Sequence, residues 1–86
     1  PRDPARLAWC AYYHAKLGEA ELARARAEEA LSVTHTPVVR VRLRLILAFD
    51  AMGDVGAAQS LLEGAGSVLL GNLLRGGEIS SSLRRA

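Results

Sequence analysis

Two arginines, Arg40 and Arg44, are the side chains whose type and spacing most clearly suggest binding chemistry. On a helix they lie one turn apart on the same face. Guanidinium groups match the planar geometry of a carboxylate with paired N–H donors, so the two arginines could together hold an acidic group of a partner. The simpler interpretation is a solvated face on which arginine serves helix stability and solubility.

Cys10 and His14 are spaced to share one helical face, and both side chains can bind zinc. A structural zinc site needs a complete tetrahedral set of ligands, whereas the remaining histidine, His35, lies in a connecting segment and the chain has no second cysteine. We therefore interpret Cys10 and His14 as ordinary residues of a helix-packing seam. We expect no metal and no other cofactor.

Catalytic chemistry finds little support in the order of the residues. Nucleophilic catalysis needs a serine or cysteine brought together with a histidine and an orienting acid, and no arrangement of this kind is indicated. The run GAGSVLLGN, which starts at Gly64, contains glycines but lacks the Lys and the Ser or Thr of a phosphate-binding loop. We predict that the chain is not an enzyme.

Three arginines of one segment and three aromatic side chains could instead form a nucleic-acid surface, with charge for phosphate and rings for stacking. They are Arg40, Arg42 and Arg44, and Trp9, Tyr12 and Tyr13. The chain has 11 basic and 9 acidic residues, and the resulting net charge of +2 is small for that purpose. We expect no nucleic-acid partner.

Composition indicates which elements position these residues. Hydrophobic residues make up 50% of the 86-residue chain, and most are alanine and leucine, which favours closely packed helices over a β-sandwich.

The single cysteine excludes an internal disulfide and fits a reducing, cytoplasmic location. No apolar run approaches the roughly 20 residues that cross a bilayer, so we expect no membrane partner. The start at Pro1 without methionine suggests a piece of a longer polypeptide, and the alanine and arginine usage suggests a bacterial source.

Two helices are predicted in the first part of the chain. Asp3 before Pro4 is a strong helix start, because the carboxylate can accept from first-turn amides and proline suits the first helical position. This helix is predicted to run to Leu17 and to end at Gly18. A second helix is predicted over about 19–32, where oppositely charged residues three or four apart indicate an exposed face. These pairs are Glu21 with Arg24, Arg24 with Glu28, and Arg26 with Glu29.

The next segment, VVRVRLRL from Val38, alternates apolar and charged residues as a half-buried strand would. We favour a helix, because Thr36 and Pro37 repeat the earlier cap-then-proline start and the apolar pattern continues to Gly53, further than most strands extend. Asp54 is then predicted to cap a fourth helix over roughly 55–63. Ser67 is predicted to cap a short fifth helix.

A faint internal repeat emerges when the chain is shifted by 35 residues. The shift places equivalent residues at the helix-helix corners and at small packing positions. Gly18 aligns with Gly53, Leu17 with Met52, Glu19 with Asp54, Ala23 with Ala58, Glu28 with Glu63 and Ala30 with Ala65.

These residues resemble the tetratricopeptide repeat, a helix-turn-helix unit of about 34 residues with small residues at its turn and along its second helix. The first unit carries the resemblance at Leu7, Gly18, Ala23, Ala27, Ala30 and Pro37, and the second at Leu45, Phe49, Gly53, Ala58, Leu62 and Ala65. The family's aromatic residue near the start of each unit is replaced by Leu7 and Arg42. Other helical-repeat families therefore stay open.

The resemblance implies an all-α fold of two antiparallel helix-turn-helix pairs in a right-handed array, followed by a short C-terminal helix. One domain would span 1–86, with repeat 1 over about 4–36, repeat 2 over about 37–66, and the terminal helix and tail over 67–86. The implied function is a scaffold that binds a peptide or helix of a partner protein, acidic in character, on a concave face lined by the first helix of each pair.

The groove-facing positions carried over from the family are Ala8, Tyr12, Lys16, Arg40, Leu43, Leu47 and Asp50. The predicted partner-binding residues are Tyr12, Lys16, Arg40, Leu43, Arg44 and Leu47. The asparagines of the family's carboxylate clamp are absent, since Asn72 is the chain's only asparagine.

A leucine cluster near the C-terminus supports an alternative function. Leu69, Leu70, Leu73 and Leu74 are too many apolar side chains for a free surface helix, so we expect them to cover a neighbouring chain or to fold back on the second pair. Homo-oligomerisation through this cluster is the first of these outcomes. The chain would then be an oligomerisation or regulatory segment of a larger protein such as a bacterial transcriptional regulator.

Overall fold

The computed structural model describes residues 3–34 and 37–63 of the chain. These ranges contain four helices, α1 (Pro4–Lys16), α2 (Ala20–Val33), α3 (Val39–Ala51) and α4 (Val55–Glu63), and no strand. The all-α prediction is confirmed, and VVRVRLRL is helical from its second residue onward. The predicted fifth helix and the tail over 67–86 lie outside the described residues.

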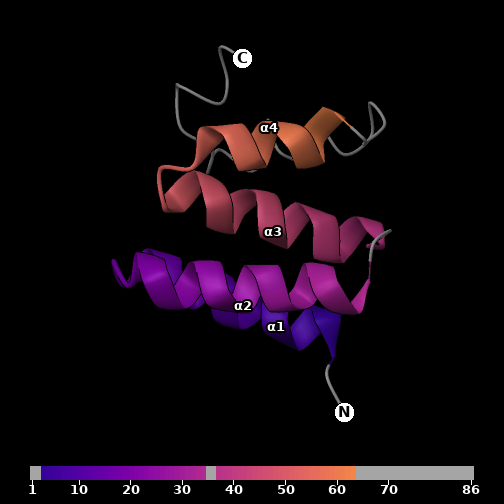
Figure 1. Cartoon of the computed structure of the whole chain (residues 1–86), viewed down its shortest axis with the longest axis horizontal. Helices are drawn as coiled ribbons and strands as arrows, with labels where there is room; N and C mark the ends of the chain where they lie inside the picture. The colour runs from indigo at the N-terminus through magenta and orange to yellow at the C-terminus, as the bar shows by residue number, and fades with distance from the viewer. Residues whose placement is uncertain (1–2, 35–36, 64–86) are drawn as a thin grey trace.

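Consecutive helices reverse direction, so that α1 with α2 and α3 with α4 form two helical hairpins (Figure 1). Helix α1 packs against both α2 and α3, and α4 packs against α3. Figure 1 shows α3 between α4 on one side and the α1–α2 hairpin on the other. The two first helices of the hairpins are therefore neighbours. The right-handed sense of the array stays a prediction.

Two aspartates begin helices as predicted. The Asp3 side chain accepts a hydrogen bond from the Ala5 N–H at 3.1 Å, and Pro4 occupies the first turn of α1. The Asp54 side chain accepts from the Ala57 N–H, also at 3.1 Å, at the start of α4. In each case the carboxylate satisfies an amide that has no partner within the helix.

The two hairpin corners share one backbone motif. Gly18 (φ 81°) and Gly53 (φ 84°) both adopt the left-handed conformation that favours glycine. The residue after each glycine donates its N–H to the third-last helical carbonyl, from Glu19 to His14 at 2.8 Å and from Asp54 to Phe49 at 2.9 Å. The predicted helix stops are confirmed, and the corners are equivalent under the 35-residue shift.

The predicted start of the third helix was wrong. Helix α3 begins at Val39, and its N-cap is Val38, which makes no side-chain cap. Because Val38 is extended, with φ −65° and ψ 162°, the buried Pro37 lies before the helix and not in its first turn. Thr36, the predicted cap, lies outside the described residues.

The core is made of alanines from the first hairpin and of larger side chains from α3. Helices α1 and α2 fully bury only alanine side chains, such as Ala11 and Ala27, which lets the two helices approach closely. Every residue from 45 to 50 is buried, so this stretch of α3 is covered on all its faces. Ala23 and Ala58, equivalent in the two hairpins, are both fully buried.

Candidate functional site

The three arginines of α3 separate onto two sides of the helix. Arg42 Nη1 donates to the backbone carbonyl of Leu61 at 2.8 Å, so this arginine is used within the second hairpin. Arg40 and Arg44 face the first half of α1, where both line a cleft. In the described part of the chain, neither of these two guanidinium groups forms an ion pair.

Arg44 is held in place by aromatic rings of α1. Its guanidinium carbon lies 3.8 Å from the centre of the Trp9 ring and 4.6 Å from that of Tyr12. Such stacking uses the face of the planar guanidinium group, whereas its N–H donors lie in the plane. Arg44 is therefore positioned by Trp9 and Tyr12 while its donors are still able to bind an anion.

The rings form a continuous cluster along α1. Trp9 and Tyr13 stack with their centres 5.4 Å apart and their planes at 27°, and Tyr12 packs edge-on against Trp9 at 6.1 Å. The Lys16 ammonium lies 5.5 Å from the centre of the Tyr12 ring. Trp9 and Tyr13 are 42% and 57% exposed, which is high for side chains of this size. The aromatic cluster therefore lies between two cationic groups, the Arg44 guanidinium at Trp9 and the Lys16 ammonium at Tyr12.

A cleft of about 270 Å³ lies between the starts of α1 and α3. Its lining consists of Asp3, Pro4, Ala5, Ala8 and Trp9 on one side, and Val38, Arg40, Val41 and Arg44 on the other. The single carboxylate of the lining, Asp3, is engaged as the cap of α1. The two guanidinium groups therefore make the cleft basic, and the Trp9 ring forms part of its wall.

The structure brings together some of the predicted partner-binding residues and separates others. Tyr12, Lys16 and Arg44 belong to one cluster, and Arg40 lies in the adjoining cleft. Leu43 is half-buried, packed against the core. The exposed rings Trp9 and Tyr13 were not among the predicted partner-binding residues, although their spacing with Lys16 along one helix could have indicated them.

Three positions expected to face an open groove are buried. Leu47 is 9% exposed and belongs to the core, so its prediction as a partner-binding residue is corrected. Ala8 is fully buried and Asp50 is 8% exposed. The physical reason is the close packing of α1 and α3 against each other and against the second helix of each hairpin, which covers residues that a wider groove would leave open.

Cys10 and His14 both lie on α1, where His14 has a partner within the chain. His14 Nδ1 lies 2.8 Å from Glu19 Oε1 across the first corner, and Cys10 is half-buried. Over residues 3–34 and 37–63, no group of three His, Cys, Asp or Glu side chains could hold a metal ion. No helix in these ranges is long and apolar enough to cross a membrane.

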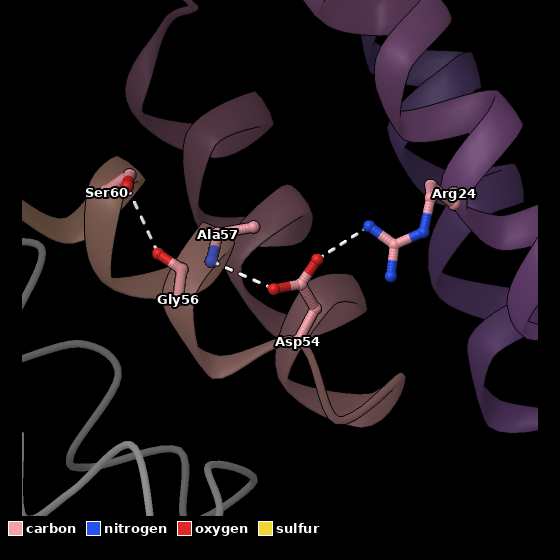
Figure 2. Close-up of polar contacts among 5 residues, drawn as sticks. All are labelled: Arg24, Asp54, Gly56, Ala57 and Ser60. Carbon is pink, nitrogen blue, oxygen red and sulfur yellow. Dashed lines mark hydrogen bonds and ion pairs between the residues drawn. The ribbon is translucent and has the colours of Figure 1, made fainter.

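The charged face of α2 differs from its prediction. Arg26 pairs with Glu29 at 2.8 Å as expected, but Arg24 Nη1 instead reaches Asp54 Oδ2 at 2.6 Å, as Figure 2 shows. The hydrogen bond from Arg24, helped by that from the Ala57 N–H, holds the pKa of the Asp54 carboxyl below its usual value. Arg24 therefore links the first hairpin to the start of α4 and forms no ion pair with Glu21 or Glu28.

The described residues define an all-α class of chain, in which two helical hairpins meet through their first helices and carry a basic, aromatic cleft at that junction. Comparison of the chain with protein-family models, with curated proteins and with solved structures finds no match. The predicted leucine cluster, Leu69, Leu70, Leu73 and Leu74, lies outside the described residues.

Proposed function

We propose that this chain is a non-catalytic, tetratricopeptide-like scaffold that binds an acidic peptide or helix of a partner protein at the α1–α3 junction. The observation that carries the proposal is the cleft between the two helices, in which Arg40 and Arg44 have no acidic partner among the described residues. Two unpaired guanidinium groups in a concave site favour a ligand that brings carboxylates.

The aromatic side of the cleft favours a ligand that also brings apolar surface. Exposed tryptophan and tyrosine side chains bury large areas at low cost in conformational entropy, and tryptophan, tyrosine and arginine are enriched where binding energy concentrates. Trp9 and Arg44 already contact each other, so little reorganisation precedes binding. A segment that alternates acidic and apolar residues matches both sides of the cleft.

Trp9 is the chain's only tryptophan, so its fluorescence reports directly on the site. The probe is an end-blocked dodecapeptide of alternating glutamate and leucine, titrated at low ionic strength. We expect saturable binding that weakens as salt is added, because the contacts are partly solvent-exposed charges. The same peptide with glutamine in place of glutamate should bind at least roughly tenfold more weakly, as expected from losing charge-assisted hydrogen bonds.

Substitutions of single arginines distinguish binding in the cleft from a general attraction between the chain's positive charge and the acidic peptide. Arg40→Gln and Arg44→Gln should each weaken binding of the glutamate peptide, whereas Arg26→Gln removes the same charge from α2 and should leave binding unchanged. Equal affinity for the glutamate and glutamine peptides, or equal effects of the three substitutions, would show that the cleft does not recognise acidic segments.

A further inference from the structure

An apolar stripe on α1 is exposed along one face. It consists of Trp9, Tyr13 and Leu17, which lie one helical turn apart and are 42%, 57% and 74% exposed. From Trp9 to Leu17 the stripe extends about 12 Å along the helix. Contiguous exposed apolar side chains of this kind mark an interaction surface more often than isolated ones do.

The internal repeat shows what normally happens to this face. A shift of 35 residues turns the α1 stripe into Arg44, Ala48 and Met52 on α3. On α3 this face is covered, since Arg44 lies over Trp9, Ala48 is fully buried and Met52 packs against the core. The face of α3 that corresponds to the α1 stripe is therefore covered, and through Arg44 it contacts α1. The α1 stripe is the same face of the first hairpin. Arg44 of α3 contacts it at Trp9, whereas Tyr13 and Leu17 are more than half exposed.

We infer that a second copy of this chain covers the α1 stripe, with the two α1 helices packed antiparallel about a twofold axis near Tyr13. The spacing supports this occupant because Trp9 and Leu17 lie equally far from Tyr13 in opposite directions. Antiparallel packing therefore places Trp9 of each copy opposite Leu17 of the second copy. Such an interface uses the same patch on both chains, as twofold interfaces do.

Charges beyond the two ends of the stripe are complementary in this arrangement. Arg6 precedes the stripe on α1, and Glu21 follows it just beyond the first corner. Both side chains are exposed, and neither forms an ion pair within the described residues. In an antiparallel pair, the end of the stripe near Arg6 of one copy lies beside the end near Glu21 of the other copy. In a parallel pair, Arg6 would instead lie beside Arg6, and Glu21 beside Glu21.

The inference does not rest on the proposed function. Trp9 belongs both to the stripe and to the wall of the peptide-binding cleft, whereas Tyr13 and Leu17 do not line the cleft, so substitutions at Tyr13 and Leu17 test the dimer alone. Sedimentation equilibrium of the whole chain over a wide range of concentration tests it. We expect a monomer–dimer equilibrium that Tyr13→Glu and Leu17→Glu each weaken roughly tenfold or more, by burying a charge at the interface. Leu22→Glu is the matched control, since Leu22 is 47% exposed on α2, outside the stripe, and its substitution should leave the equilibrium unchanged.

Charge reversal provides the specific test of the antiparallel arrangement. Arg6→Glu and Glu21→Arg should each weaken the dimer, and the two together should restore it. Circular dichroism verifies that every variant keeps its helices, as expected for exposed positions. A chain that is monomeric at every concentration overturns the inference, and so does a dimer that Leu73→Glu abolishes while Tyr13→Glu leaves it intact.

Discussion

The Arg24 guanidinium lies 2.6 Å from the carboxylate of Asp54, and the same carboxylate accepts the Ala57 N–H at the start of α4 (Figure 2). One side chain therefore caps a helix of the second hairpin and holds a cation from the first. Because the two oxygens of Asp54 take different partners, the two roles can be tested separately.

Replacement of Asp54 by alanine should lower the free energy of unfolding by about 1 kcal/mol at neutral pH, the usual cost of losing an N-cap. Asp54→Asn keeps a capping oxygen but removes the charge, so it should cost less. The pKa of Asp54 is lowered in the folded chain. Its negative charge therefore stabilises the fold fully at pH values above the carboxyl's ordinary pKa of 3.8. The stability difference between the wild-type chain and Asp54→Asn should therefore shrink as the pH falls through the folded pKa. Urea unfolding at a series of pH values measures it, and a difference that stays constant into acid would contradict the ion pair.

The corner glycine Gly53 should not tolerate a side chain. A Cβ at Gly53 would meet no atom within 4 Å, so the cost of Gly53→Ala comes only from the positive φ of 84°. We expect a loss of about 1 kcal/mol in the free energy of unfolding. Gly56→Ala is the matched control, because Gly56 lies within α4 and the nearest atom would be an ordinary 3.9 Å away. That substitution should stabilise the chain by roughly 0.5 kcal/mol, and thermal unfolding compares the two.

The fully buried Ala58 marks the contact between α4 and the core. Ala58→Leu would force a large side chain into this closely packed position and should cost about 1 to 3 kcal/mol of stability. Ala25→Leu places the same side chain on the exposed face of α2 and should change the thermal midpoint little. Equal midpoints for the two variants would show that Ala58 does not lie at a helix crossing.

The neighbouring arginines Arg40 and Arg42 should differ in their effects on stability. Arg42 donates to the Leu61 carbonyl and so helps to hold α4 against α3, and Arg42→Ala should cost roughly 1 kcal/mol. Arg40 is exposed and lines the cleft, so Arg40→Ala should leave the free energy of unfolding nearly unchanged. Chemical denaturation compares the free energies of unfolding of the two variants. A larger loss for Arg40→Ala than for Arg42→Ala would contradict the assignment of Arg40 to the cleft and of Arg42 to the contact with α4.

Local features of the fold were predictable because they depend on residues close together in the chain. The Asp3 and Asp54 caps and the two corner glycines act over a few residues. The aspartates therefore indicate where α1 and α4 start, and the glycines indicate where α1 and α3 end. The start of α3 was not predictable in this way. A proline after a threonine fits both a helix start and an extended approach to one, and the buried position of Pro37 decides between them.

The sequence by itself determined the all-α class, the starts of α1 and α4, and the corners at Gly18 and Gly53 that the 35-residue shift relates, since caps and positive-φ glycines are local signals. Only the tertiary structure decided that Arg24 reaches Asp54, that Arg44 stacks on Trp9, and that Leu47 is buried. Each of these depends on which helices lie side by side and how closely they pack. A charged or apolar side chain at helical spacing has several partners within reach, and the packing of distant segments selects among them.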